Sequence, residues 1–113
     1  MELKTSDYSI WHDPASSTVF FRGFLRLDGM EEYKPLMELL LDAVDQSPHF
    51  NLNLRELEFL NSSGISMLSM FVVKVRDRGN VQLVLQGSDK ILWQTRSLKN
   101  LQRLMPSLKL EFV

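Results

Sequence analysis

Two hydrophobic periodicities alternate along this chain, and their alternation limits the folds that it can adopt. Short segments carry apolar residues at every second position, which is the pattern of half-buried β-strands. Between them, apolar residues recur at the spacing of amphipathic α-helices. The patterns predict strands over 8–12, 18–27, 50–54, 81–85 and 108–112, and helices over 33–44, 63–78 and 90–101.

The predicted order is β-β-α-β-α-β-α-β, and it favours an α/β fold. Strands that alternate with helices indicate a mixed, mainly parallel sheet with helices packed on it, while the first two strands form an antiparallel hairpin. We expect Pro35 in the first turn of the first helix, because proline lacks the N–H that later turns require. The 113 residues fit a single domain over 1–113.

Composition argues against several classes of function. Hydrophobic residues make up 44% of the chain and charged residues 24%, the balance of a globular protein. The net charge is −1 and the basic residues are scattered, so we expect no nucleic-acid partner. The chain has no apolar run near the ~20 residues of a membrane helix and no signal peptide, which predicts a cytoplasmic protein without a membrane partner.

The residues that usually build catalytic or metal sites are scarce. Cysteine is absent, and His12 and His49 stand far apart without ligand-like spacing, so we expect no metal and no cofactor. No nucleophile elbow or phosphate loop occurs, which argues against an enzyme. Trp93 is expected to be a half-buried anchor of its helix.

The segment Asn61-Ser62-Ser63-Gly64 stands directly before a strongly periodic helix. Asn and Ser are favoured N-caps, because their side-chain oxygens accept from unpaired N–H groups of the first turn. Gly64 would remove bulk where those N–H groups point, leaving an accessible polar patch. Plain helix capping is one interpretation, and the other is a serine that is phosphorylated at the positive end of the helix dipole.

The following helix carries a second candidate surface opposite its core face. Ser66, Met70 and Val73 fall together there on a helical wheel. Single apolar residues are common on protein surfaces, so scattered exposure is one interpretation. The other is a face that docks a partner, for which flexible Met is well suited.

The stretch from Phe50 to Leu85 resembles the STAS domain of anti-sigma-factor antagonists. A strand leads to an (acidic)-Ser-Ser-Gly-(aliphatic) signature, which reads Asn61-Ser62-Ser63-Gly64-Ile65 here, and an amphipathic helix and an apolar strand follow. The resemblance implies that Ser62 is phosphorylated by a partner kinase of the anti-sigma-factor type and dephosphorylated by a PP2C-type phosphatase. Asn61 replaces the usual acidic residue, and the family's closing helix after the last strand is missing.

We therefore predict a non-enzymatic, bacterial partner-switching regulator. The alternatives are a constitutive STAS adaptor of a signalling or transport complex, and a small-molecule or nucleotide sensor that uses the helix N-terminus. Ser62 is the expected phosphorylation site, with Ser63 the less favoured acceptor. The residues expected to contact the partner are Asn61, Ser62, Ser63, Gly64, Ser66, Met70 and Val73.

Overall fold

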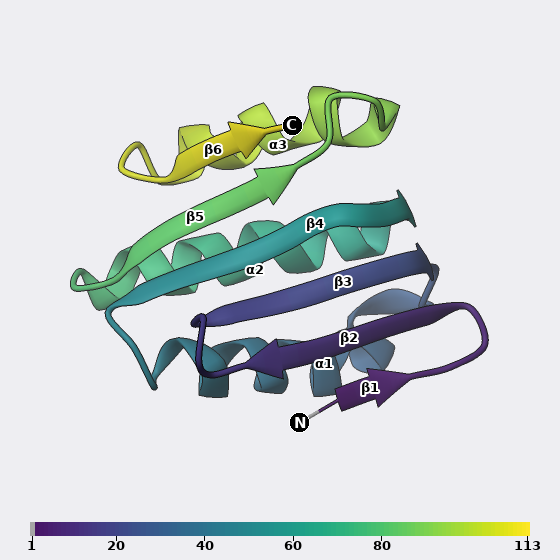
Figure 1. Cartoon of the computed structure of the whole chain (residues 1–113), viewed down its shortest axis with the longest axis horizontal. Helices are drawn as coiled ribbons and strands as arrows, with labels where there is room; N and C mark the ends of the chain where they lie inside the picture. The colour runs from purple at the N-terminus through teal and green to yellow at the C-terminus, as the bar shows by residue number, and fades with distance from the viewer. Residues whose placement is uncertain (1) are drawn as a thin grey trace.

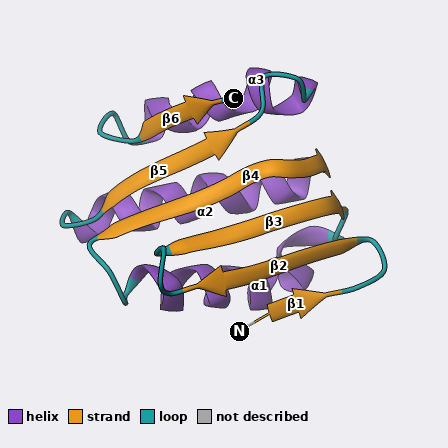
Figure 2. Cartoon of the chain, in the orientation of Figure 1, coloured by secondary structure: helices purple, strands orange, loops and turns teal. Residues whose placement is uncertain are grey.

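The chain folds into a six-stranded sheet with three helices (Figures 1 and 2). The structure is a computed structural model that describes residues 2–113. The elements in chain order are β1 (Glu2–Lys4), β2 (Tyr8–Asp13), β3 (Thr18–Leu25), α1 (Gly29–Val44), β4 (His49–Leu60), α2 (Ser62–Arg78), β5 (Gln82–Gly87), α3 (Leu92–Leu104) and β6 (Lys109–Phe112). The predicted α/β class and mainly parallel sheet are confirmed.

The strands lie side by side in the same order as in the sequence. β1, β2 and β3 pair antiparallel, and β3, β4, β5 and β6 pair parallel. Each parallel connection passes through one helix and advances the sheet in the same direction. Since such crossovers are right-handed, all three helices fall on one face. Figure 1 shows them together behind the sheet, so the opposite face is left open.

The hydrophobic core lies between this single helix layer and the sheet. Phe50 of β4 and Phe71 of α2 are fully buried and meet edge to face, with ring centroids 6.1 Å apart. In β4, the less buried Asn51 and Asn53 alternate with the buried Phe50, Leu52 and Leu54, as expected of a sheet that is solvated on one face. In α2, Ile65 is half-buried and Met67 is fully buried.

β1 is an element that the predicted order omits. Its three residues contain a single apolar side chain, Leu3, too few to show any periodicity. Its pairing with β2, in which Leu3 lies opposite Ile10, supplies the stability that the segment lacks locally. The observed order is therefore β-β-β-α-β-α-β-α-β.

The first helix begins earlier than the predicted 33–44. It starts at Gly29, so Pro35 lies beyond the first turn, and the expectation for Pro35 was wrong. Pro35 is exposed, which lets water reach the carbonyl that it leaves unpaired. The missed signal is Glu32, whose Oε1 accepts from the backbone N–H of Asp28 at 3.0 Å and so closes the start of the helix.

β4 is longer than predicted because its buried residues change spacing. Leu54, Leu57 and Leu60 are all buried at intervals of three, which breaks the alternation of a regular strand. The pairing of β3 with β4 shifts twice across this stretch, as expected of β-bulges. Each bulge absorbs one residue and returns the next leucine to the core.

Gln94 of α3 supplies the hydrogen bonds that the second half of β4 would otherwise lack. β5 pairs with β4 only as far as Asn53. Beyond that point, Nε2 of Gln94 donates to the carbonyls of Leu54 at 2.5 Å and Leu57 at 3.0 Å. Its Oε1 accepts from the N–H of Ser88 at 2.8 Å, and the side chain is completely buried.

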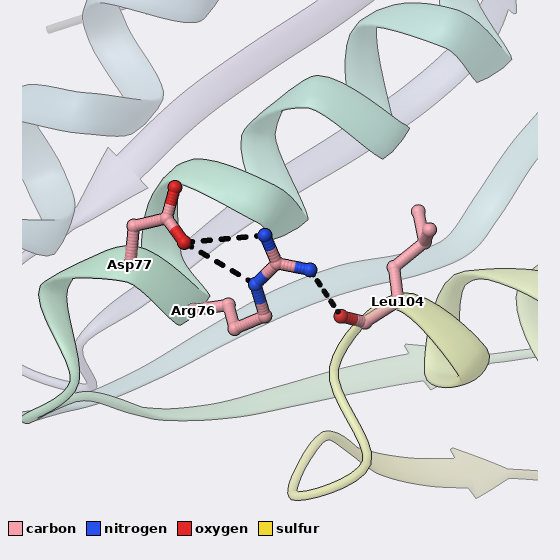
Figure 3. Close-up of polar contacts among 3 residues, drawn as sticks. All are labelled: Arg76, Asp77 and Leu104. Atoms are coloured by element: carbon pink, nitrogen blue, oxygen red, sulfur yellow. Dashed lines mark hydrogen bonds and ion pairs between the residues drawn. The ribbon is translucent and has the colours of Figure 1, made fainter.

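Arg76 joins the far ends of α2 and α3. Its guanidinium donates to the Leu104 carbonyl at 3.2 Å, one of the free carbonyls at the end of α3, and Asp77 Oδ1 accepts two further bonds at 3.2 Å (Figure 3). Within residues 2–113, no helix is long and apolar enough to cross a membrane.

We predict that Gln94→Leu lowers the free energy of unfolding by about 2–4 kcal/mol, because it leaves the Leu54 carbonyl and the Ser88 N–H without their partners. Urea denaturation measures the change. Gln82→Leu, at an exposed position of β5, is the control and should change stability by less than about 0.5 kcal/mol. Equal small effects of both substitutions would contradict the role assigned to Gln94.

Candidate functional site

The predicted site lies at the carboxyl edge of the parallel strands. β3 and β4 end at this edge, and α1 and α2 begin there (Figure 1). Asn61 is the only residue between β4 and α2, and its N–H donates to the Leu25 carbonyl at the end of β3, 3.3 Å away. The segment from Asn61 to Gly64 is therefore tied to two neighbouring strands.

Asn61 is the N-cap of α2 and uses both ends of its carboxamide. Its Oδ1 accepts from the backbone N–H of Gly64 at 2.9 Å and from the hydroxyl of Tyr33 at 2.6 Å. Its Nδ2 donates to the Leu27 carbonyl at 2.7 Å. One side chain thus connects α2 to α1 and to the loop that precedes α1.

Tyr33 is fully buried and completes this network. Its hydroxyl oxygen accepts a hydrogen bond from the N–H of Leu27 at 3.3 Å, and the hydroxyl donates a hydrogen bond to Oδ1 of Asn61. Burial raises the pKa of Tyr33 above its ordinary value, although the hydrogen bond from Leu27 opposes the shift and Tyr8 adds to it. The hydroxyl therefore stays protonated at neutral pH and remains a donor.

Ser62 does not cap the helix, which corrects the interpretation of this serine as a capping residue. It is the first residue of α2, and its side chain is exposed. Its hydroxyl makes no hydrogen bond to any residue that the structure describes. Ser63 is half-buried and therefore less accessible. Ser62 is thus a free hydroxyl at the positive end of a helix.

Gly64 has a different role from the one predicted. It is buried, so it does not open a polar patch for a partner. A Cβ at this position would lie 2.2 Å from Cδ1 of Leu60 and 2.7 Å from the Tyr33 hydroxyl. Glycine is required because the start of α2 passes directly over these two side chains.

The Leu27 carbonyl gives a physical reason for Asn61 in place of the usual acidic residue. A carboxylate could still cap α2 and would suit the helix dipole. It could not donate to Leu27, and two oxygens would then face each other where Nδ2 now makes a 2.7 Å bond. The amide is the side chain that satisfies the donor and the acceptors together.

The outer face of α2 has the predicted arrangement. Ser66 is exposed, Met70 is 46% exposed and Val73 is half-buried. Ser69, on the same side, donates its hydroxyl to the Ile65 carbonyl at 3.0 Å and is used within the helix. A binding role for Met70 and Val73 remains a prediction.

Other residues considered in the sequence lie elsewhere. His12 is in β2, and His49 begins β4 at the opposite edge of the sheet from Ser62. The described residues contain no group of three or more His, Asp or Glu side chains that could hold a metal. Trp93 is half-buried and donates to the Leu57 carbonyl at 3.0 Å, as expected of an anchor for α3.

Sequence reasoning missed Tyr33, which binds Asn61, and Gln94, which binds the backbone of β4 before the site. Tyr33 is the first residue of the predicted helix 33–44, and its hydroxyl reaches Asn61, 28 residues away in the sequence, only in the fold. Gln94 occupies a buried position of an amphipathic helix, and this polar residue on the apolar face was the available signal.

Comparison with known proteins identifies the fold. No family model and no curated protein matches the chain. A chain in the crystal structure of the diguanylate cyclase SiaD in complex with its activator SiaC, from Pseudomonas aeruginosa, matches with a TM-score of 0.72 and 12% identity, over 99% of this chain and 97% of that one. SiaC of Pseudomonas aeruginosa matches with a TM-score of 0.64 and 12% identity, covering 100% and 96% of the two chains. Its apo crystal structure matches with a TM-score of 0.60 and 13% identity, covering 100% and 97%.

At these identities the likeness concerns the fold. The mixed, mainly parallel sheet with its helices matches the fold of the SiaC structures, and SiaC is described there as the activator of the diguanylate cyclase SiaD. The fold is also compatible with a STAS-like domain, and membership of that family stays a prediction.

We predict that Asn61→Asp destabilises the protein by about 1–3 kcal/mol at neutral pH, because the Leu27 carbonyl loses its donor and faces a carboxylate oxygen. The loss should shrink as the pH falls, since a protonated carboxyl can donate to Leu27. Chemical denaturation between pH 4 and 8 measures both effects. Asn100→Asp, at an exposed position of α3, is the control; a loss that does not vary with pH would contradict this account.

Proposed function

We propose that this chain is a non-enzymatic partner-switching regulator whose switch is reversible phosphorylation of Ser62. The observation that carries the proposal is that capping and exposure fall on different residues at the start of α2. Asn61 makes the capping bonds, and the exposed Ser62 hydroxyl is left without a structural task. A serine free of structural duties can be modified without loss of the fold.

A phosphate on Ser62 is compatible with the folded domain. It would add about −1.5 to −2 charge at neutral pH. Near a helix N-terminus such a charge is favourable by about 0.3–1 kcal/mol. The structural network of Asn61, Tyr33 and Gly64 does not include the Ser62 side chain, so modification leaves it in place.

The same phosphate would oppose a bound partner. We propose that the partner covers Ser62 and the outer face of α2 formed by Ser66, Met70 and Val73. A dianion beneath that interface loses its hydration, and close like charges cost several kcal/mol. Phosphorylation would therefore release the partner, and removal of the phosphate would restore binding.

The comparisons support a protein partner in general terms. The crystal structure with a TM-score of 0.72 concerns SiaC as the activator of the diguanylate cyclase SiaD, so this fold serves at least once as a regulator that binds another protein. The kinase of anti-sigma-factor type and the PP2C-type phosphatase come from the STAS resemblance. We propose them as the partners that modify Ser62.

A second candidate is a constitutive adaptor that activates a partner without phosphorylation. The SiaC–SiaD complex favours it, since SiaC is there described as an activator. In an adaptor, Ser62 would have no role in release.

We predict that Ser62→Asp weakens partner binding at least tenfold and that Ser62→Ala retains it, because only the first places a negative charge beneath the interface. Mass spectrometry after incubation with the cognate kinase should locate phosphate on Ser62, and calorimetry compares the affinities. Ser107→Asp, an exposed serine on the turn between α3 and β6, is the control. Equal affinity of Ser62→Asp and Ser62→Ala would favour the adaptor.

We predict that Met70→Glu weakens partner binding about tenfold or more while the melting temperature stays within a few degrees. The side chain is 46% exposed, so the charge is tolerated in the free protein but must be desolvated in the complex. Asn100→Glu makes the same change of charge on exposed α3 and should leave affinity unchanged. Unaltered binding by Met70→Glu would remove the outer face of α2 from the interface.

A further inference from the structure

Exposed apolar side chains gather at the carboxyl edge of the sheet. Among the described residues, six large hydrophobic side chains are exposed. Phe24, Phe59, Met30 and Leu92 lie at the last residues of β3 and β4 or the first residues of α1 and α3. Val113 joins them, because its N–H donates to the carbonyl of Gly87 at the end of β5. Only Met70 lies away from this edge, and such gathering is typical of an interaction surface.

Arg26 lies over two of these side chains. Phe24 and Phe59 face each other on neighbouring strands and are 44% and 38% exposed. The guanidinium carbon of Arg26 is 4.9 Å from the centre of the Phe59 ring and 5.9 Å from that of Phe24. These distances are those of cation–π contacts. We name Phe24, Arg26 and Phe59 the Arg26 clamp.

Among residues 2–113, no acidic side chain forms an ion pair with the guanidinium of the Arg26 clamp. Arg26 is exposed and forms no ion pair or hydrogen bond with any of residues 2–113. Arg22, four residues earlier and within β3, does pair with Glu56, at 3.7 Å. Asp7 lines a shallow hollow together with Arg26 but makes no ion pair with it. The N–H donors of Arg26 are therefore available to a group from outside.

We propose that the Arg26 clamp is part of the partner interface and receives a carboxylate side chain of the partner protein. A guanidinium that lies on aromatic rings keeps its in-plane N–H groups free, and their fork matches the two oxygens of a carboxylate. The flanking phenyl rings exclude water and strengthen the pair. Arg and aromatic residues are also enriched where interfaces bind most strongly. This inference rests on the proposed protein-binding function and adds the chemistry of the contact.

The clamp is tied to Ser62 through Asn61. The backbone N–H of Asn61 binds the Leu25 carbonyl and its side chain binds the Leu27 carbonyl, so Arg26 stands in the chain between the two points that Asn61 holds. Ser62 is the next residue after Asn61. A phosphate on Ser62 would add negative charge at the same edge of the sheet and would oppose the approach of an acidic partner group. An acidic partner group thus explains why the switch should release the partner.

The test begins with photo-crosslinking in the native cell. The full-length protein carries a benzophenone amino acid at position 24, 59 or 70, and the crosslinked peptides are identified by mass spectrometry. Adducts at positions 24 and 59 that map beside an Asp or Glu of another protein are expected. Adducts to a second copy of this chain, to a surface without acidic residues, or at position 70 alone would overturn the clamp.

Binding measurements with the purified partner then test whether the charge of Arg26 contributes to affinity. Arg26→Glu should weaken binding at least thirtyfold, and replacement of the partner's crosslinked acidic residue by Arg should restore it. Arg26→Lys should weaken binding a fewfold, since it keeps the charge but loses the fork. Arg22→Glu, which makes the same change of charge at an exposed position of β3, is the matched control, and circular dichroism verifies that each variant is folded. Equal losses for Arg22→Glu and Arg26→Glu, or no rescue, would contradict the proposal.

The two proposals can fail separately. If Arg26→Glu abolishes binding while Ser62→Asp does not, the clamp stands and the phosphorylation switch falls. If Ser62→Asp releases the partner while Arg26→Glu binds normally, the switch stands and the clamp falls.

Discussion

The side-chain amide of Asn61 holds the candidate site together. It caps α2, accepts a hydrogen bond from the buried Tyr33 hydroxyl and donates one to the Leu27 carbonyl before α1. Each of these groups would be costly to leave unpaired. The starts of two helices and the end of a strand are therefore positioned by one residue. Because that residue does the capping, Ser62 has no structural bond to break when it is modified.

The strand order of the sheet determines which elements surround this site. Strand order equals sequence order, so right-handed crossovers place every helix on one face. The parallel strands then end together at a single edge, where the helices begin. Phe24, Arg26 and Phe59 are exposed where β3 and β4 end. Figure 1 shows all three helices behind the sheet, so no helix lies in front of the strand ends.

Local patterns predicted those parts of the structure that depend on local physics. Periodicity identified the three helices and five of the strands, because burial on one side imposes its own repeat on the sequence. It failed at β1, which has one apolar residue, and in β4, where two bulges replace alternation by a three-residue spacing. The predicted start of α1 was too late, because it relied on placing Pro35 in the first turn. The hydrogen bond between the Asp28 N–H and Glu32, which marks the true start, is seen only in the structure.

The candidate site divides in the same way. The sequence by itself determined that residues 61–64 begin an amphipathic helix and that Ser66, Met70 and Val73 share its outer face, since both follow from helical geometry. Only the tertiary structure decided that Asn61 is the cap, that Gly64 is buried and that Ser62 is free. Those assignments depend on Tyr33 and Leu27, which lie far from Asn61 in the sequence, and on the way in which the Leu60 side chain packs beneath Gly64. Arg26 likewise meets Phe59 only because β3 and β4 pair, and a contact between strands leaves no periodic trace in either segment.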